Sequence, residues 1–225
     1  TRWATHGEPS ERNAHPHVSS NITVVHNGII ENHRVLREQL EGLGFRFTSD
    51  TDTETIAHLI EACRVGQWTG QEEGDLFSCV RCAERYLKGA YALAVLSEDE
   101  PESLVVAREG SPLLVGLGED GHYAASDASA LLSVTRRMVY LENGDVARLT
   151  RTGMALVDGT GQATAREVIT SSLSADAVQL GHFSHYMQKE IFEQPQALGN
   201  TLEMIAGTRE LQAGVFGAGA AEVLA

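Results

Sequence analysis

Apolar and polar positions change their spacing near residue 89 of this 225-residue chain. Before that point apolar residues recur every three or four positions, which predicts amphipathic helices. After it, short apolar runs alternate with turn residues, which predicts strands. The predicted helices are 29–43, a segment from Thr51 to Cys63, 75–88 and a short one at 128–132; the predicted strands are 22–27, 45–49, 91–96, 104–107, 113–117, 123–125, 138–141, 146–149, 154–157 and 163–168. Early helices followed by many short strands predict an α+β fold of stacked sheets covered by helices.

The stretch from Thr23 to Asn32 is the predicted organising feature of the chain. Its β-branched residues end a buried strand, and Asn27-Gly28 then gives a sharp turn into a helix, because both residues tolerate positive φ. Such a turn would direct the Asn27 amide and the Gly28 N–H toward a carbonyl oxygen that gains negative charge. The alternative interpretation is a tight connector without chemistry, since Asn-Gly turns are common.

Other local patterns predict boundaries along the chain. Thr51 and Glu54 have the spacing of a capping box, which marks a helix start. Glu142-Asn143-Gly144-Asp145 is the strongest hairpin signal in the sequence. A linker follows residue 170, a helical pattern covers 185–192, and the Ala/Gly-rich end at 213–225 indicates a cut helix or a frayed tail.

Composition narrows the class of partner. The formal net charge of −14 and a pI near 5.0 disfavour nucleic acid and anionic membranes as partners. No apolar run approaches the ~18 residues of a membrane helix, and the start of the chain has no apolar signal core. Three cysteines, an odd number, do not make a disulfide framework, so we expect a reducing compartment. The expected localisation is cytoplasmic. Because the chain opens without Met in a strand-like segment, we expect a fragment or a processed product.

Three candidate chemistries have ordinary structural alternatives. Six of the nine histidines lie in the first 60 residues, but none has zinc-ligand spacing, so we expect polar loop histidines that hydrogen-bond to one another and no metal. Cys79 and Cys82 fall inside an amphipathic helical pattern, and Cys63 on an apolar helical face, so all three are predicted core residues rather than redox or nucleophilic groups. Thr1 remains an alternative nucleophile, with its own α-amine as base.

A fourth set of residues suits an amino-acid ligand. Arg2 offers a planar fork for an α-carboxylate, and Asp52 offers a carboxylate for an α-ammonium. Asn27 and Gly28 offer donors for an oxyanion. Taken singly, each has another explanation: a surface ion pair, a helix cap, a turn. Their joint occurrence in one order favours the ligand-binding interpretation.

Several motifs closely resemble the glutaminase domain of glutamine–fructose-6-phosphate aminotransferases. They are Thr-Arg-Trp-Ala-Thr-His-Gly (1–7), Asn-Ala-His-Pro-His (13–17), Val-His-Asn-Gly-Ile-Ile-Glu-Asn (25–32), Ser-Asp-Thr-Asp-Thr-Glu (49–54), Gly-Ala-Tyr-Ala (89–92), Ser-Pro-Leu (111–113), Ala-Ser-Asp (125–127) and His-Tyr-Met-Gln-Lys-Glu-Ile (185–191). The last of these resembles the hinge between glutaminase and sugar isomerase in that family.

The resemblance implies an N-terminal-nucleophile αββα sandwich, two antiparallel sheets between helix layers, incomplete at its N-terminus. It implies hydrolysis of glutamine and transfer of the ammonia to fructose 6-phosphate, giving glucosamine 6-phosphate without a cofactor. By position, Arg2 would clamp the α-carboxylate, Asp52 the α-ammonium, and Asn27 with Gly28 the oxyanion. The remaining roles implied by the resemblance are Thr5 and His6 beside the substrate, Trp3 as the gate of the ammonia passage, and His15 as a support of the pocket loop.

The resemblance also implies how the chain is divided. The family's nucleophile is a Cys at the mature N-terminus, which would lie upstream of Thr1, so we expect this chain alone to be inactive. Residues 1–169 would be a partial glutaminase domain, 170–196 an interdomain linker, and 197–225 the start of a truncated isomerase domain. Fructose 6-phosphate would bind only through that missing domain, and the full-length enzyme would be a homodimer.

Two further functions stay open at this point. One is a non-catalytic remnant that binds glutamine without hydrolysing it. The other is a different class-II amidotransferase, such as a purine- or asparagine-forming enzyme, against which the motif at 185–191 argues.

Overall fold

A computed structural model describes residues 7–72, 74–171, 180–181 and 183–205 of the chain. The chain divides into two compact units, Thr1–Ala175 and Asp176–Ala225. The predicted domain limits at 169 and 196 remain a prediction; helix α5 (Tyr186–Ile205), in the second unit, runs across the second of them.

In the first unit, α1 to α3 precede residue 89 and most strands follow it, as the change in spacing predicts. Its helices are α1 (His33–Gly42), α2 (Asp52–Arg64) and α3 (Leu76–Glu84), with 3₁₀ turns η1 (Glu11–Asn13) and η2 (Ala128–Leu131). Its strands are β1 (His17–Ser19), β2 (Ile22–Ile30), β3 (Gly89–Ser97), β4 (Leu104–Glu109), β5 (Leu114–Leu117), β6 (His122–Ala125), β7 (Arg137–Tyr140), β8 (Asp145–Leu149), β9 (Met154–Val157) and β10 (Val168–Thr170).

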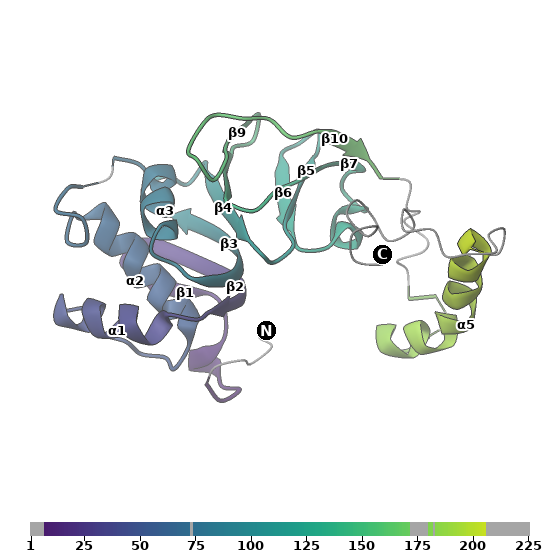
Figure 1. Cartoon of the computed structure of the whole chain (residues 1–225), viewed down its shortest axis with the longest axis horizontal. Helices are drawn as coiled ribbons and strands as arrows, with labels where there is room; N and C mark the ends of the chain where they lie inside the picture. Colours follow the sequence, from purple (N-terminus) through teal and green to yellow (C-terminus); the bar gives the residue numbers. More distant parts are fainter. Residues whose placement is uncertain (1–6, 73, 172–179, 182, 206–225) are drawn as a thin grey trace, which may run out of the picture. The chain divides into compact units, whose positions relative to one another are not determined.

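Two antiparallel sheets stack in the first unit. The larger has the order β1-β2-β3-β4-β8-β9 and the smaller the order β10-β7-β5-β6. Helices α1, α2 and α3 cover one face of the larger sheet, and the smaller sheet lies toward its other face (Figure 1). One apolar cluster fills the helix–sheet layer, and a second joins the sheets through residues such as Val106 of β4 and Val139 of β7. The predicted α+β class is confirmed.

Helix α2 is the central helix of this unit. Every one of its residues except Arg64 is buried, although several are polar. The predicted start is confirmed, because the Thr51 side chain accepts a hydrogen bond from the Glu54 N–H at 3.3 Å. A helix buried on all sides packs against the sheet and against its neighbouring helices at once.

The predicted turn at Asn27-Gly28 is wrong. Both residues lie inside β2, which continues to Ile30, and α1 begins only at His33. Gly28 has a positive φ of 135°, but its neighbours remain paired with β3, Asn27 opposite Ala92. The glycine therefore permits a close strand–strand approach rather than a reversal of the chain.

The predicted strand at 45–49 is also wrong. Phe45 and Phe47 instead pack on the ring of His58, with ring centroids 5.2 and 4.6 Å away. The N–H groups of Thr48 and Ser49 donate to the Glu54 carboxylate at 2.8 and 2.7 Å, so a side chain replaces a partner strand.

The predicted hairpin around 142–145 is not a hairpin, because the flanking strands enter different sheets. Strand β7 belongs to the smaller sheet and β8 to the larger one. Gly144 donates its N–H to the Arg108 carbonyl oxygen of β4 at 2.8 Å, and the Asp145 carboxylate accepts the Glu142 N–H at 2.7 Å. These contacts form a tight corner at the crossing point between the sheets.

The strand predicted at 163–168 is displaced toward the C-terminus. Ala163 makes only an isolated bridge to Val157, and β10 begins at Val168. β10 then pairs with β7 in the smaller sheet, Val168 opposite Val139. The chain therefore crosses back between the sheets over 163–168, where the Arg166 guanidinium pairs with Asp145.

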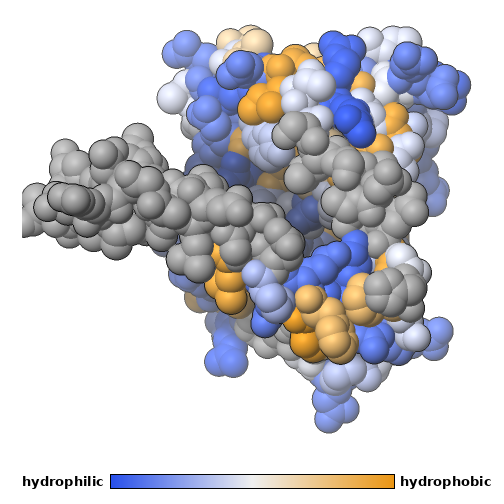
Figure 2. All heavy atoms as spheres, turned by 90° about the vertical axis from the view of Figure 1, so that its right-hand side faces the viewer, coloured by the Kyte–Doolittle hydropathy of each residue, from blue (hydrophilic) through white to orange (hydrophobic). Residues whose placement is uncertain are grey.

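The described part of the second unit is helical. α5 begins at Tyr186, one residue after the predicted start of the segment 185–192, and Phe183 stacks on Phe192 with ring centroids 5.7 Å apart. The predicted tail at 213–225 lies outside the described residues. On the face of the molecule in Figure 2, hydrophilic and hydrophobic patches are interspersed around the grey atoms. Among the described residues, no helix combines the length and apolarity that a membrane crossing requires.

Candidate active site

The start of α2 is fastened to strand β2. The Asp52 carboxylate accepts a hydrogen bond from the Ile30 N–H at 3.0 Å and lies 4.0 Å from Nδ1 of His26. Asp52 is only 1% exposed. A buried carboxylate needs hydrogen-bond partners to be tolerated in the interior. The predicted ammonium-binding acid therefore lies against the strand that carries both predicted oxyanion residues.

Gly28 lies at a close approach of β2 and β3. A Cβ atom at this position would be 2.1 Å from the carbonyl oxygen of Ala90, and the φ of 135° disfavours any L side chain. Asn27 is exposed, and strand alternation directs its side chain to the face opposite His26 and Ile30. The structure thus brings Asp52 against β2, the strand that carries Asn27 and Gly28.

Tyr91 lies opposite Gly28 and is not available as a base. Its side chain is almost fully buried, and this burial, reinforced by Glu84 and Glu109, raises the pKa of its phenol well above the ordinary value. The phenol is therefore neutral at physiological pH. Burial also raises the pKa of Glu84, with Glu109 adding to the effect.

The predicted support residue His15 is tied to the beginning of α2. Its Nε2 lies 3.3 Å from the Thr53 hydroxyl, and Nδ1 of His26 lies 3.1 Å from the same hydroxyl. One hydroxyl next to Asp52 therefore joins the loop before β1 to strand β2. A hydroxyl can donate to one ring and accept from the other, which suits this position.

The other buried histidines also hold Ser and Thr hydroxyls. His17 Nε2 lies 3.2 Å from the Thr51 hydroxyl, and His58 Nδ1 lies 2.8 Å from that of Ser19. These hydrogen bonds join histidines to hydroxyl groups, so the predicted hydrogen bonds from one histidine to another stay a prediction. Within the described ranges, no group of three or more His, Cys, Asp or Glu side chains is placed to hold a metal ion.

The Glu54 carboxylate holds the segment before α2, a role that the capping-box spacing does not predict. Its carboxylate accepts four hydrogen bonds of 2.7–2.8 Å, from the N–H and hydroxyl groups of Thr48 and Ser49. Burial alone would raise the pKa of Glu54, but donors from His58, Ser49 and Thr48 outweigh it and lower the pKa far below its usual range. The available signal was the Thr-Ser pair just before the capping box. Glu54 fixes the segment that leads into Asp52.

Four predicted site residues, Arg2, Trp3, Thr5 and His6, lie outside the described residues. The convergence of Arg2 with Asn27 and Asp52 around one ligand therefore stays a prediction. Of the predicted residues, the structure places His15 and Asp52 together at the start of α2, with Gly28 on the adjoining strand.

The cysteines are core residues, as predicted, but they are not all thiols. Cys63 and Cys82 form a disulfide with their Cα atoms 6.3 Å apart, a bond that the prediction of separate core residues did not include. Cys79, outside that bond, is fully buried. A sequence does not show which helix faces meet, so the pairing of two cysteines on different helices had no local signal. None of the three is placed as an exposed nucleophile.

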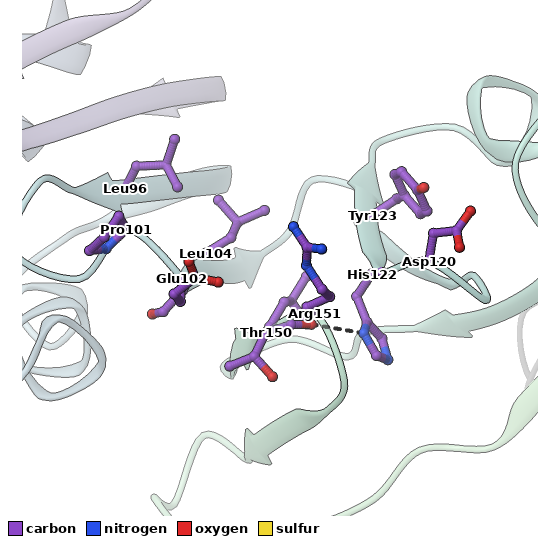
Figure 3. A pocket seen from close by; sticks show the side chains of 12 residues that line it. Leu96, Pro101, Glu102, Leu104, Asp120, His122, Tyr123, Thr150 and Arg151 are labelled. Atoms are coloured by element: carbon purple, nitrogen blue, oxygen red, sulfur yellow. Dashed lines mark hydrogen bonds between the residues drawn. The ribbon is translucent and has the colours of Figure 1, made fainter.

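A cavity of about 310 Å³ lies away from these residues, between the β3–β4 turn and β6 (Figure 3). His122 and Thr150 face each other across it, joined by a 2.9 Å hydrogen bond from the His122 ring to the Thr150 carbonyl oxygen. Its β3 residue, Leu96, pairs with Thr23, which is four residues, or roughly 13 Å, from Asn27 along β2. This cavity contains none of the predicted site residues.

A family model described as a glutamine amidotransferase domain matches residues 2–133, more than half of the chain. The chain belongs to the glutamine amidotransferase domain family. The matched range contains all eight predicted site residues, from Arg2 to Asp52, and ends before β7.

Two curated relatives of this glutamine amidotransferase domain have the same name. Glutamine–fructose-6-phosphate aminotransferase [isomerizing] of Vibrio cholerae is 54% identical over 203 residues, which are 90% of this chain and 32% of that protein. The protein of the same name from Pectobacterium atrosepticum is 50% identical over 225 residues, 100% of this chain and 36% of its own length. The chain thus spans about a third of the length of these relatives.

Solved structures of amidotransferases are similar to this domain. The glutamine phosphoribosylpyrophosphate amidotransferase of B. subtilis, complexed with ADP and GMP, matches with a TM-score of 0.58 at 26% identity, over 72% of this chain and 34% of that one. A structure described as the allosteric regulatory enzyme of purine biosynthesis matches with a TM-score of 0.52 at 27% identity, over 64% of this chain and 30% of that one. These similarities confirm the predicted N-terminal-nucleophile sandwich class.

Proposed function

We propose that this domain hydrolyses glutamine to glutamate and ammonia, and that the longer protein transfers the ammonia to fructose 6-phosphate to form glucosamine 6-phosphate. One observation carries this proposal: identity of 50–54% to glutamine–fructose-6-phosphate aminotransferases over 90–100% of the chain. The phosphoribosylpyrophosphate amidotransferase and the enzyme of purine biosynthesis are only 26% and 27% identical, so fructose 6-phosphate is favoured as the acceptor over the acceptors of those enzymes.

The proposed roles follow the chemistry of each residue. Arg2 binds the α-carboxylate of glutamine through a bidentate fork, and Asp52 binds its α-ammonium. The Asn27 amide and the Gly28 N–H donate to the oxyanion that forms when the side-chain amide is attacked. Thr5 and His6 border the substrate, His15 supports the start of α2 through Thr53, and Trp3 gates the ammonia passage.

The nucleophile does not come from the cysteines of this chain. Cys63 and Cys82 are joined to each other, and Cys79 is buried between the helices and the larger sheet. We propose that a Cys at the mature N-terminus, outside residues 1–225, attacks the amide carbon with its own α-amine as base. Ammonia leaves, and water then hydrolyses the thioester to glutamate.

The test compares this chain with a version extended upstream to the start of its reading frame. We expect glutamate release from glutamine only with the extended version. In that version, Asn27→Ala should lower kcat by about 10²–10³-fold, and Asp52→Asn should chiefly raise KM for glutamine. Asp50→Asn is the control, because Asp50 is exposed and pairs with Arg12. Turnover by this chain alone that disappears in Thr1→Ala would contradict the proposal and support the terminal threonine.

Two further measurements separate the alternatives. Glutamine binding by calorimetry without any hydrolysis in the extended version would support a non-catalytic glutamine-binding protein. Glucosamine 6-phosphate formation by the full-length protein tests the acceptor. We also propose that this protein is a cytoplasmic homodimer, without nucleic-acid or membrane partners, and light scattering of the full-length protein tests the dimer.

A further inference from the structure

The layer between α2 and α3 contains all three cysteines of the chain. Cys63 lies in the last turn of α2 and Cys82 in the second half of α3, 19 positions later. Their Cα separation of 6.3 Å lies within the range of natural disulfides. Between them lies the polar loop that contains Gly66, Gly70 and Gly74.

We propose that Cys63 and Cys82 are a site of reversible oxidation, whose disulfide fastens α3 to α2 and stabilises the helix layer of the domain. Two thiols lose two protons and two electrons as the sulfur–sulfur bond forms. The acceptor is a low-molecular-weight disulfide such as oxidised glutathione, which is reduced to two thiols. This inference does not depend on glutamine hydrolysis.

Cys63 and Cys82 are bonded across two helices, and helix geometry disfavours a bond between Cys79 and Cys82 within α3. Cys79 and Cys82 lie one turn apart on α3, where Cβ atoms are about 5–6 Å from each other. A disulfide needs Cβ atoms about 3.5–4.5 Å apart, so these two cysteines cannot join without unwinding the helix. The Cys-x-x-Cys spacing of 79–82 is therefore not itself a redox pair, and the cross-link joins two different helices.

The cross-link acts on a segment with many accessible conformations when unfolded. It closes the chain around a glycine-containing loop and so removes conformations from the unfolded state. α3 has only nine residues, and its start is held by the Asp75 side chain, which accepts the Ser78 N–H at 2.8 Å. The bond holds its second half. Because Cys63 and Cys82 are 0% and 3% exposed, a reductant reaches the bond only when α3 opens.

The experiment measures thiols and thermal stability of this chain after incubation with oxidised glutathione or with dithiothreitol. Alkylation in denaturant followed by intact mass should count one thiol in the oxidised chain and three in the reduced chain, and peptide mapping should place the bond at 63–82. Oxidation should raise the Tm by about 6–12 °C. Reduction should be slow in buffer and faster in sub-denaturing urea.

Three Cys→Ser variants show whether a change in Tm comes from the 63–82 disulfide or from other effects of the oxidant. Cys63→Ser and Cys82→Ser should each abolish the redox-dependent change in Tm. Cys79→Ser should keep it, because Cys79 is equally buried on the same helix but outside the bond. Three alkylated thiols in the oxidised wild-type chain, a bond mapped to Cys79, or a Tm change that persists in Cys63→Ser would each overturn the proposal. The thiol count of the wild-type chain needs no variant to fold.

Discussion

At the scale of single residues, Glu54 illustrates how a buried charge can define a segment. Two adjacent residues, Thr48 and Ser49, donate four short hydrogen bonds to its carboxylate, and the ring of His58 lies 3.7 Å away. Hydrogen bonds to an ionised acceptor are stronger than those between neutral groups. The segment before Asp52 is therefore held by one side chain rather than by a strand.

Glu54→Gln should lower the free energy of unfolding by about 2 kcal/mol at pH 7. The NH₂ group of the new amide would face N–H and O–H groups of Thr48 and Ser49, so hydrogen-bond donors would face donors without an acceptor between them. Urea denaturation followed by circular dichroism measures the change. Glu38→Gln on α1 is the matched control, since Glu38 is exposed, and should change stability by less than about 0.5 kcal/mol.

The same variant should change the dependence of stability on pH. The folded-state pKa of Glu54 lies below its ordinary value of 4.5, so the unfolded state takes up the proton first on acidification. Its stabilisation is complete above the unfolded pKa and is lost as pH falls toward the folded pKa. The difference between wild type and Glu54→Gln should therefore shrink below pH 4.5. A constant difference down to acid unfolding would contradict this account.

Gly28→Ala should destabilise the domain by about 3 kcal/mol or more. The added Cβ would meet the Ala90 carbonyl oxygen at 2.1 Å, and its φ of 135° is strained for alanine. Gly42→Ala, at the last residue of α1, is the control, because nothing lies within 4 Å of the added Cβ. It should stabilise by about 0.5–1 kcal/mol. Equal unfolding midpoints for the two variants would exclude the close approach at Gly28.

At the scale of elements, two Asn-Gly pairs show why local sequence predicts elements better than their connections. Asn27-Gly28 lies within a strand, and Asn143-Gly144 lies at a crossing between sheets, although both have the composition of tight turns. A turn pattern reports which φ values are accessible, but it does not report which sheet receives the next strand. Capping at Thr51 was predictable because that hydrogen bond is local.

In the candidate site, too, the local features were predictable from the sequence and the long-range contacts were not. Asp52 at a helix start was predictable from its position after Thr51, and it does begin α2. The hydrogen bond from Ile30 to Asp52, the Thr53 hydroxyl between His15 and His26, and the disulfide all join residues 19 or more positions apart. Such contacts depend on how α2 packs on the sheet, and residue spacing contains no information about that packing.

The crossing corner depends on one buried ion pair. Asp145 is 0% exposed and binds the Arg166 guanidinium with both oxygens, at 2.9 and 2.8 Å. Asp145→Asn should destabilise the domain by about 2–3 kcal/mol, reduced from the fully buried case because Arg166 is partly exposed and keeps Glu142 at 3.0 Å. Chemical denaturation measures this. The control Asp50→Asn removes an exposed ion pair with Arg12 and should lower the free energy of unfolding by less than about 1 kcal/mol. An equal decrease in both variants would show that the Asp145–Arg166 pair does not stabilise the corner.

At the scale of the whole molecule, the compact unit is larger than the range that the family model matches. The match ends at residue 133, yet β8 pairs with β4 and β9 pairs with β8, so the chain at 145–157 extends the larger sheet. β10, ending at Thr170, pairs with β7 in the smaller sheet. Removing residues after 133 would expose the apolar cluster between the sheets, so both sheets need the chain through Thr170.

Helix α2 has protein on every side, with only Arg64 outside the buried set. It carries Asp52 in its first turn and Cys63 in its last. At the buried positions of a helix enclosed in this way, a change of side-chain volume or polarity must be matched by a neighbouring element, so the sequence diverges there only when that element changes with it. Among homologous proteins, replacements along this helix should therefore appear as compensated pairs.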